Sequence, residues 1–324
     1  MLGPTRDPSE DGSVVGRCWL EGLNQLEKRR TEMNTMSARK WLTYSVFVSP
    51  AVLLFALIIF WPFCKAVLFS FQDWNGISAD IKWAGWGNFE RLMKDTDYIK
   101  SFMFTMKFVI VGTILTNLVG FALAIVLNMA LKTRNMLRTV FFMPHVIGSL
   151  IIGFIWQFII TQVFPHIASF TGWDLFAKNW LSLPDYAFWS LVLVKVWHYS
   201  GYLMVIYLAA LQGIPKDLLE AAEIDGATAW KRLWHIIVPL VRPAVTVCLF
   251  LAISHGFKVF DMNFALTKGG PFGTTESLAL HIYMDAFSKN EYTYASAKAV
   301  VFFLILASVT LVQVFTMKRK EVEM

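Results

Sequence analysis

The chain of 324 residues is 56% hydrophobic and 16% charged, with 28 phenylalanines and 13 tryptophans. Soluble domains average about 45–50% apolar and about 25% charged residues, so this composition excludes an ordinary soluble domain and predicts a protein that lies in lipid. The formal net charge of +6 is not gathered in a basic stripe on a polar face, which excludes a nucleic-acid-binding protein.

The N-terminal part combines a polar tail with an apolar stretch. Residues 1–40 are polar and mixed in charge, and we expect a disordered cytoplasmic tail there. The run from Trp41 to Cys64 carries no charge and is too long for the apolar region of a signal peptide. It predicts a first transmembrane helix, in a segment that extends over 41–69.

Five further stretches are predicted to cross the membrane, since a helix needs about 20 mainly apolar residues to do so. They are Phe108–Leu131, Thr139–Phe164, Phe188–Leu211, Ile236–Phe257 and Ala299–Met317. The fourth helix of the chain is interrupted by Lys195 and His198. The fifth is short in apolar residues, and Arg242 near its end must extend its side chain toward the interface.

Positive charges indicate the orientation of these six helices. Basic residues precede the first helix, link the second and third, and open the tail 318–324: Arg29, Arg30, Arg39, Lys40, Lys132, Arg134, Arg138, Lys318, Arg319 and Lys320. All three places lie on one side of a six-helix chain, and the positive-inside rule assigns that side to the cytoplasm. Both termini are therefore expected inside, and the acidic segment 70–105 is expected to form an external loop.

A segment between the fourth and fifth helices does not follow this charge rule. Pro215 suits the first turn of a helix, and Asp217 and Glu220 suit its N-terminal end. Gly226 is placed to end that helix, and a second helix then continues into the fifth span. Periodicity by itself favours an ordinary amphipathic loop helix.

The exact residues of the segment are more specific than its periodicity. The segment resembles the EAA loop of bacterial ABC-importer permeases. The match consists of Glu220-Ala221-Ala222, then Gly226 after three residues, Ile236 after nine more, and Val238-Pro239 after one more. The family pattern has leucine where this chain has Val238. The resemblance implies a cytoplasmic coupling helix that docks into a cleft of an ATPase subunit. The coupling residues that it implies are Glu220, Ala221, Ala222, Asp225, Gly226, Ile236 and Pro239.

Two further stretches are similar to one branch of that family. Residues 207–215 resemble the lead-in to the EAA loop of carbohydrate-uptake permeases. The LTxGGP loop of the same branch resembles Leu266-Thr267-Lys268-Gly269-Gly270-Pro271. That loop is found in the first permeases of maltose, multiple-sugar and glycerol-phosphate systems. The resemblance covers about 49–317. It implies an all-α polytopic membrane protein with six transmembrane helices, the type I ABC importer (MetI-like) permease fold, whose core over 104–317 includes a coupling loop over 214–239.

The resemblance also implies partners and a location. These are a second permease subunit, a dimer of ATP-binding cassette ATPases and an extracellular or periplasmic solute-binding protein, assembled at the plasma membrane of a bacterium. The chain itself has no GxxxxGK[ST] phosphate-binding loop and no recognisable catalytic motif. We therefore expect no enzyme activity and no cofactor, with ATP hydrolysis on a partner chain.

Metal and disulfide sites are not expected either. Cys18, Cys64 and Cys248 lie far apart, and the histidines form no HExxH motif.

The alternative function is a self-sufficient secondary transporter or channel. It predicts an inverted internal repeat, of which the two halves of the chain show no convincing trace, and it leaves the EAA loop unexplained.

Ionisable residues inside a membrane span are costly, so each is a functional hypothesis. The candidates for the solute path are Lys195, His198, Tyr199 and His255. Tyrosine rings can stack on sugar rings, although hydrogen bonding between helices and snorkelling toward the interface explain these residues somewhat better. In the fifth helix we expect Lys258 to pair with Asp261, and we assign Asn117 and His145 to interhelical packing.

Overall fold

A computed structural model describes residues 40–41, 43–74, 76, 80–129 and 132–318. The expected N-terminal tail 1–40 therefore lies outside the described residues except for its last position. The chain divides after Lys65 into two units. The described part of the first belongs to an apolar helical stretch, Thr43–Ser70, that is long enough to cross a membrane. It includes a π-helical turn, η1 (Ala56–Phe60), and continues as α2 (Trp61–Ser70).

The second unit is almost entirely helical. Its elements are β1 (Gln72–Asp73), β2 (Lys82–Trp83), α3 (Gly87–Met93), α4 (Thr96–Asn128), α5 (Arg134–Val146), α6 (Ser149–Phe158), η2 (Ile159–Val163), α7 (Phe164–Thr171), α8 (Asp174–Ala177), η3 (Trp180–Ser182), α9 (Pro184–Gln212), α10 (Lys216–Ile224), α11 (Ala229–Arg232), η4 (Leu233–Ile237), α12 (Val238–Leu240), α13 (Arg242–Phe257), α14 (Asp261–Leu266), α15 (Leu278–Phe287) and α16 (Tyr292–Lys318). The two short strands pair antiparallel.

The prediction of a polytopic all-helical membrane protein is confirmed. The described residues contain five helices long and apolar enough to cross a membrane, or six if one bent pair counts as a span. The bent pair is Ala229–Leu240 with Arg242–Phe257, which meet at 70°. We predicted this fifth span as one continuous helix. Pro243 follows the bend, and because proline has no backbone N–H it cannot donate a helical hydrogen bond to a carbonyl of the preceding turn.

The second span begins earlier than its apolar residues indicate. Asp95 caps α4 by accepting hydrogen bonds of 3.0 Å from the backbone amides of Asp97 and Tyr98. Such a cap satisfies amides that a helix start leaves without partners. The segment 70–105, which we predicted as an external loop, therefore includes the first turns of α4 as well as β1, β2 and α3.

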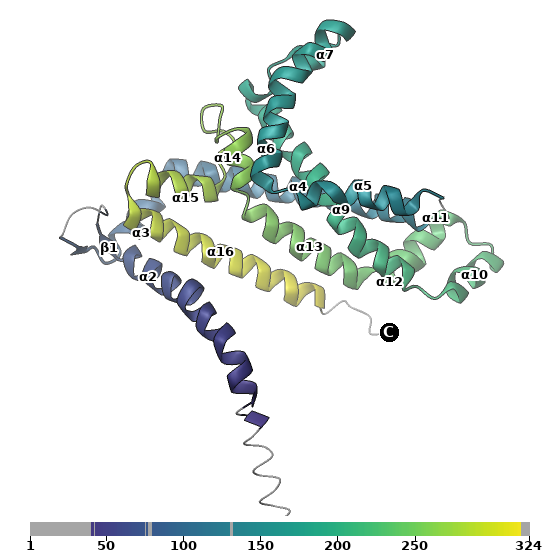
Figure 1. Cartoon of the computed structure of the whole chain (residues 1–324), viewed down its shortest axis with the longest axis horizontal. Helices are drawn as coiled ribbons and strands as arrows, with labels where there is room; N and C mark the ends of the chain where they lie inside the picture. Colours follow the sequence, from purple (N-terminus) through teal and green to yellow (C-terminus); the bar gives the residue numbers. More distant parts are fainter. Residues whose placement is uncertain (1–39, 42, 75, 77–79, 130–131, 319–324) are drawn as a thin grey trace, which may run out of the picture. The chain divides into compact units, whose positions relative to one another are not determined.

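The predicted third span, Thr139–Phe164, is wrong in its first part. α5 ends at Val146, and Ile147 and Gly148 are extended, with ψ of 133° and 139°. The membrane-length helix then runs over Ser149–Thr171 as α6, η2 and α7, and it rises out of the bundle that α4, α9, α13 and α16 form (Figure 1). The apolar run is continuous across the break, so hydropathy could not locate it.

The core of this unit lies where α4 and α9 pack along each other. Gly120 of α4 permits the close approach, because a Cβ there would fall 3.0 Å from the carbonyl oxygen of Ser200 and 3.1 Å from Leu203. Nearby, the hydroxyl of Tyr207 donates a 2.7 Å hydrogen bond to Asn117. This bond confirms the packing role that we predicted for Asn117, since small residues and interhelical hydrogen bonds hold helices together in lipid.

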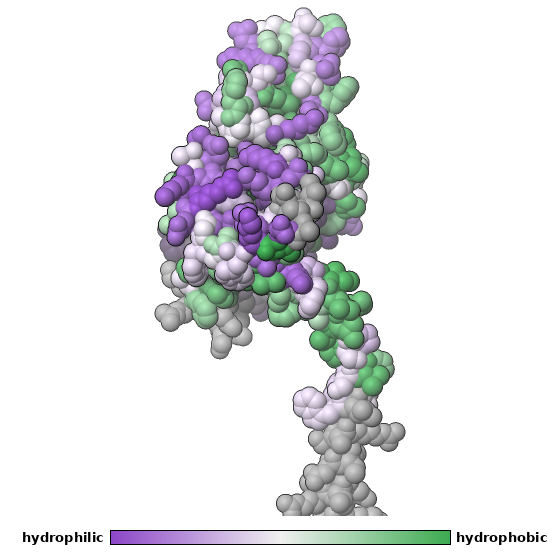
Figure 2. All heavy atoms as spheres, turned by 90° about the vertical axis from the view of Figure 1, so that its left-hand side faces the viewer, coloured by the Kyte–Doolittle hydropathy of each residue, from purple (hydrophilic) through white to green (hydrophobic). Residues whose placement is uncertain are grey.

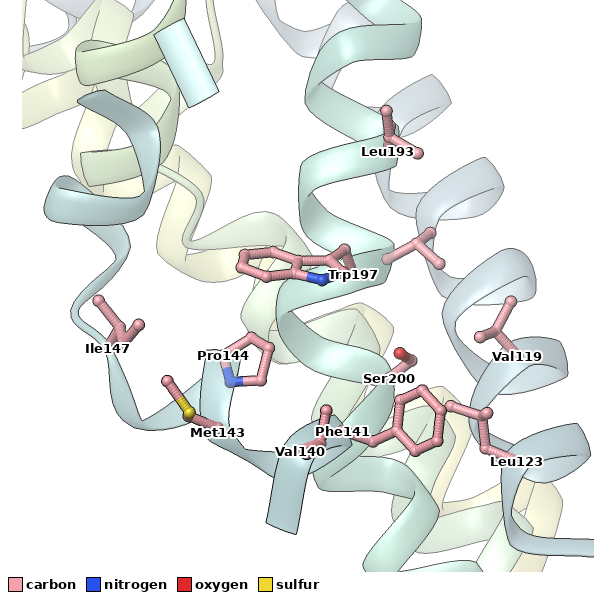
Figure 3. Close-up of a pocket in the computed structure, with 11 residues that line it drawn as sticks. Val119, Leu123, Val140, Phe141, Met143, Pro144, Ile147, Leu193, Trp197 and Ser200 are labelled. Carbon is pink, nitrogen blue, oxygen red and sulfur yellow. The ribbon is translucent and has the colours of Figure 1, made fainter. Parts of the chain in front are cut away.

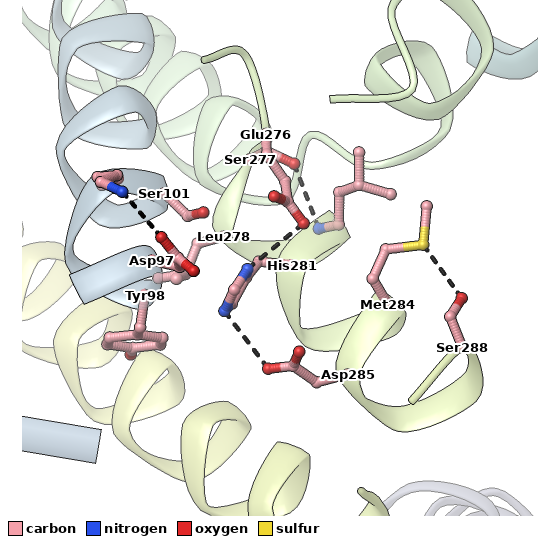
Figure 4. A network of polar contacts seen from close by, with 12 residues as sticks. Asp97, Tyr98, Ser101, Glu276, Ser277, Leu278, His281, Met284, Asp285 and Ser288 are labelled. Carbon is pink, nitrogen blue, oxygen red and sulfur yellow. Dashed lines mark hydrogen bonds and ion pairs between the residues drawn. The ribbon is translucent and has the colours of Figure 1, made fainter. Parts of the chain in front are cut away.

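One end of the bundle carries a buried ion network around Lys298 of α16. The ammonium group of Lys298 lies 2.6 Å from Asp95 and 2.5 Å from Asp285, and its Nζ is 2.9 Å from Nε2 of His281. Lys298 is 1% exposed. Figure 4 shows His281 between Glu276 and Asp285, to which its ring nitrogens lie at 3.3 and 3.4 Å. Figure 2 faces this end, over which hydrophilic side chains gather.

The two carboxylates of the network are held in their charged forms. Burial raises the pKa of Asp95, but hydrogen bonds from Lys298, from the Tyr98 amide and from Tyr294 outweigh burial and lower the pKa well below its usual range. Burial likewise raises the pKa of Asp285, and hydrogen bonds from Lys289 and Lys298 bring it below its usual value. The two carboxylates therefore stay ionised at neutral pH, in contact with the ammonium group of Lys298.

Replacing Lys298 by methionine is expected to destabilise the protein by roughly 3–5 kcal/mol, because two carboxylates would lose their buried cation. Lys289→Met is the matched control, because Lys289 also bonds Asp285, at 2.7 Å, but its side chain is 60% exposed, and exposed pairs contribute about 0–1 kcal/mol. Thermal unfolding of both variants in nanodiscs measures the difference. Equal unfolding temperatures would show that the network is not needed for stability.

Candidate functional site

The predicted coupling segment forms a helix, a glycine turn and a second helix. α10 begins after Pro215 and ends at Ile224. Gly226 then takes a φ of +74°, which confirms the positive-φ turn, a conformation that glycine adopts without steric cost. The amide of Ala227 donates a 2.9 Å bond to the carbonyl of Ala222, and the Asp225 amide donates one of 3.0 Å to Ala221. These bonds satisfy carbonyls that the end of α10 would otherwise leave unpaired.

Side-chain contacts fix the two helices relative to each other. Arg232 of α11 donates a 2.8 Å hydrogen bond to Glu223 of α10, across the turn. Ala222 is buried, and Leu219 packs against the core cluster of α4 and α9. Thr228 caps α11 through a 3.4 Å hydrogen bond from the amide of Lys231. The turn is therefore supported from the bundle side.

Both helices of the turn and η4 expose large apolar side chains. Ile224 is 87% exposed and Trp230 is 67% exposed, and Trp234 and Leu218 are also largely exposed. Glu220 lies on the exposed surface of α10. We call these five residues the coupling face. An exposed apolar patch with a charged neighbour is a typical protein-interaction surface.

The other predicted coupling residues divide between this surface and its support. Ala221 and Asp225 are exposed on α10 and its C-terminal cap, next to the coupling face. Ile236 in η4 and Pro239 in α12 are half-buried, so they shape the connection to α13. The structure thus brings the predicted residues into one segment but gives them different surroundings.

A second group of residues lies inside the bundle, where α5 meets α9 and α13. The four predicted solute-path residues come together there, and Tyr202 and His145 join them: Lys195, His198, Tyr199 and Tyr202 from α9, His145 from α5 and His255 from α13. We call these six residues the polar cluster.

Ring stacking organises the polar cluster. Tyr199 and His255 stack with centroids 4.2 Å apart and planes 18° apart, and His145 stacks on Tyr202 at 4.5 Å and 19°. His145 also meets Tyr199 edge-on at 5.3 Å. The aromatic faces therefore connect α5, α9 and α13 at one level of the bundle.

Hydrogen bonding within the polar cluster is incomplete. His198 Nε2 lies 3.1 Å from the carbonyl oxygen of Ile147, and the Tyr199 hydroxyl donates a long, 3.5 Å bond to Leu251. Nδ1 of His145, Nδ1 of His255 and Nζ of Lys195 are buried without a hydrogen-bond partner among the described residues. Buried polar groups are usually paired, so these three nitrogens are among the exceptions in the described part of the chain.

The comparisons with known proteins identify the class of protein. Residues 116–321 match the family model of the binding-protein-dependent transport system inner membrane component. The chain belongs to this family.

Relatives support the assignment over nearly the whole chain. This permease is 42% identical to the probable starch degradation products transport system permease protein AmyD of Thermoanaerobacterium thermosulfurigenes, over 87% of this chain and 96% of the relative. It is 29% identical to the multiple sugar-binding transport system permease protein MsmF of Streptococcus mutans, over 87% and 97%.

A solved structure supports the fold. A chain of a bacterial ABC transporter involved in the import of alginate aligns with a TM-score of 0.76 and 21% identity, over 87% of this permease and 96% of that chain. The resemblance that the EAA loop indicated is thereby confirmed. The protein is the multi-pass membrane permease component of a binding-protein-dependent importer, in which a separate subunit hydrolyses ATP.

From the sequence, Tyr202 lies one helical turn from His198 and belongs with it to the same wall of the fourth helix. Sequence reasoning missed His145 as a member of the permease's polar cluster. We assigned His145 to packing because it comes from a different helix, and no spacing rule relates it to α9. The expected pairing of Lys258 with Asp261 is wrong, because no ion pair joins these exposed residues, which flank the break between α13 and α14.

A separate pocket of about 560 Å³ lies on another face of α9. Figure 3 shows Trp197 and Ser200 of α9, Val119 and Leu123 of α4, and Pro144 of α5 around it. Apart from the hydroxyl of Ser200, the side chains named here are apolar or aromatic. The residues that line this pocket include none of the polar cluster.

A close backbone contact holds His145 in the polar cluster. A Cβ on Gly201 of α9 would fall 1.9 Å from the carbonyl oxygen of Phe141 in α5. We expect Gly201→Ala to push α5 away from α9, separate His145 from Tyr202, and cost about 1–3 kcal/mol of stability, as overpacking does. Thermal unfolding and solute uptake in proteoliposomes check this.

Gly87→Ala serves as the control for this substitution, because a Cβ at that helical position meets nothing within 4 Å. Its stability should stay within about 0.5 kcal/mol of the parent protein. If the two alanine variants unfold alike, the close approach of α5 and α9 does not position the cluster.

Proposed function

We propose that this permease forms half of the pathway by which a sugar or related small solute enters a bacterial cell, and that ATPase subunits drive it through the coupling face. The observation that carries the proposal is the supported turn at Gly226, which presents Ile224 and Trp230 outward. An exposed apolar surface of this kind needs a protein partner. The names of relatives that transport starch products and multiple sugars support a carbohydrate as the solute.

The proposed partners follow from the same surface and from the bundle. The coupling face docks in a cleft of one ATPase of a dimer, where Glu220 reaches basic or backbone donors. A second permease subunit provides the other half of the pathway, and a solute-binding protein delivers solute from outside. The assembly sits in the plasma membrane, with the coupling turn over 214–239 and both termini in the cytoplasm and the acidic segment 70–105 outside.

The proposed solute path includes the polar cluster. Lys195, His198, Tyr199 and His255 combine hydrogen-bonding groups with stacked rings, and both features suit a sugar, whose hydroxyls need polar partners and whose ring face packs on aromatic side chains. Alternating access would expose the cluster to each side in turn, as ATP binding shifts the population between two conformations. The chain converts motion at the ATPase into opening of the path.

We expect Gly226→Asp and Glu220→Lys to abolish uptake while the protein stays in the membrane. A side chain at φ +74° costs on the order of 1 kcal/mol and turns α11 away from its position, and the lysine reverses the charge of the coupling face. Co-purification with the ATPase and solute-stimulated ATP hydrolysis in proteoliposomes are the measurements.

Two alanine variants separate backbone from surface effects. Gly226→Ala introduces only a Cβ, with no atom within 4 Å, so any loss of coupling comes from the backbone. Gly213→Ala is the control, because its φ is −79° and a Cβ there would meet only carbonyl oxygens at 3.4 Å or more. Normal coupling in both Gly226→Asp and Glu220→Lys would remove the main support for the proposal.

The proposed orientation is tested by cysteine labelling in intact cells. In a chain without its natural cysteines, Asp80→Cys should react with an impermeant thiol reagent, and Thr133→Cys should react only after the cells are opened. Both positions are exposed in the structure, so burial does not confuse the result. The reverse pattern of labelling would place the termini outside.

A further inference from the structure

We propose that the polar cluster binds an anionic group of the solute, a carboxylate or a phosphate, and that Lys195 is the residue that pairs with it. The inference rests on the proposed function, since it takes the cluster to line the solute path. It goes further by naming the charge that the site selects.

Two buried lysines in this chain have opposite surroundings. Lys195 and Lys298 are each 1% exposed. Lys298 contacts two carboxylates and a histidine at 2.5–2.9 Å. Lys195 Nζ has no hydrogen-bond partner among the described residues, and lies 4.7 Å from the centroid of the Phe108 ring. A buried charge without a partner is costly, so the contrast marks Lys195 as a group whose partner comes from elsewhere.

The surrounding helices make room for this ammonium group. A Cβ on Gly112 of α4 would fall 2.9 Å from Nζ of Lys195, and a Cβ on Gly256 of α13 would fall 2.6 Å from it. Either side chain would displace the lysine. The ammonium group thus occupies a space that two glycines leave open, next to His255 on α13.

The side chains of the polar cluster supply donors and positive charge but no carboxylate. Besides Lys195, the cluster contains three histidines and two tyrosines, and buried Nδ1 atoms of His145 and His255 are also without partners among the described residues. A neutral hydroxyl could accept a hydrogen bond from Lys195, but it would leave the ammonium charge uncompensated. A carboxylate or phosphate supplies both the acceptor and the opposite charge, and charge-assisted hydrogen bonds are the stronger kind.

The stacked rings complete a site for a sugar acid or a sugar phosphate. Tyr199 and His255 lie face to face at 4.2 Å, so the two facing ring surfaces cover each other. The carbon face of a sugar ring would therefore pack on the outer face of one of these rings. The anionic group would then meet the ammonium at the end of that surface.

The test uses the complete importer in nanodiscs, with saturation-transfer NMR as the measure of binding. The probes are D-glucuronate, D-glucose 6-phosphate and D-glucose at millimolar concentration. At least one anionic probe should bind about tenfold more tightly than glucose, the change expected of one charged hydrogen bond. Glucuronate and glucose 6-phosphate as separate arms distinguish a carboxylate from a phosphate.

Lys195→Met should remove the preference for the anionic probe, so that this probe binds no more tightly than glucose. The matched control is Lys107→Met, because Lys107 also lies over an aromatic ring, 4.4 Å from Phe188, but is exposed on α4. This variant should keep the preference. Thermal unfolding adds a second readout: Lys195→Met should not lower the unfolding temperature of the complex, since it removes an unpaired buried charge.

Three results would overturn the proposal. The first is equal or absent binding of the anionic probes relative to glucose. The second is an anion preference that survives Lys195→Met or disappears equally in Lys107→Met. The third is a large fall in unfolding temperature for Lys195→Met, which would assign the lysine to the support of the fold. A fourth result would separate this inference from the proposed function. If glucose binding depends on Tyr199 but the anionic probes bind no better than glucose, this inference is overturned and the proposed solute path stands.

Discussion

A charge buried in a membrane bundle is costly unless it is paired, and Asp95 and Asp285 pair with Lys298 at one end of this permease. The three residues come from the last span, the start of α4 and the short helix α15. Because the pairs are buried, the geometry of each partner is tightly constrained. The network therefore fixes the ends of these helices to one another, and the rest of the bundle extends from this anchor.

Glycine contacts set the spacing of the helices farther along the bundle. Gly120 brings α4 against α9, and Gly201 brings α5 against α9. Gly112 and Gly256 leave the space in which Lys195 lies. Close packing of this kind is the main source of helix association in lipid, where apolar side chains gain little by leaving one apolar solvent for another. The polar cluster is thus a consequence of where small residues permit three helices to meet.

The sequence was sufficient for the class of protein and for a polytopic all-helical fold, and insufficient for the contacts between the helices. Hydropathy finds a helix because its residues are neighbours in the chain, and the spacing of Glu220 and Gly226 indicates the coupling turn in the same way. The extended residues before Ser149 interrupt an apolar run without changing its composition. Likewise Asp95 and Lys298 are 203 residues apart in the numbering of the chain, and only the fold brings them together.

Helical segments of the chain join the coupling turn to the polar cluster on both sides. α9 carries Tyr199 and leads into α10, while α11, η4 and α12 lead through the 70° bend into α13, which carries His255. From Tyr199 to the end of α9 is about 20 Å at 1.5 Å per residue. If the coupling face docks on an ATPase as proposed, its displacement would act on both members of the Tyr199–His255 stack, because each belongs to a helix that leads to the coupling turn. Packed helices have discrete arrangements, so the proposed docking would open or close the stack as a unit.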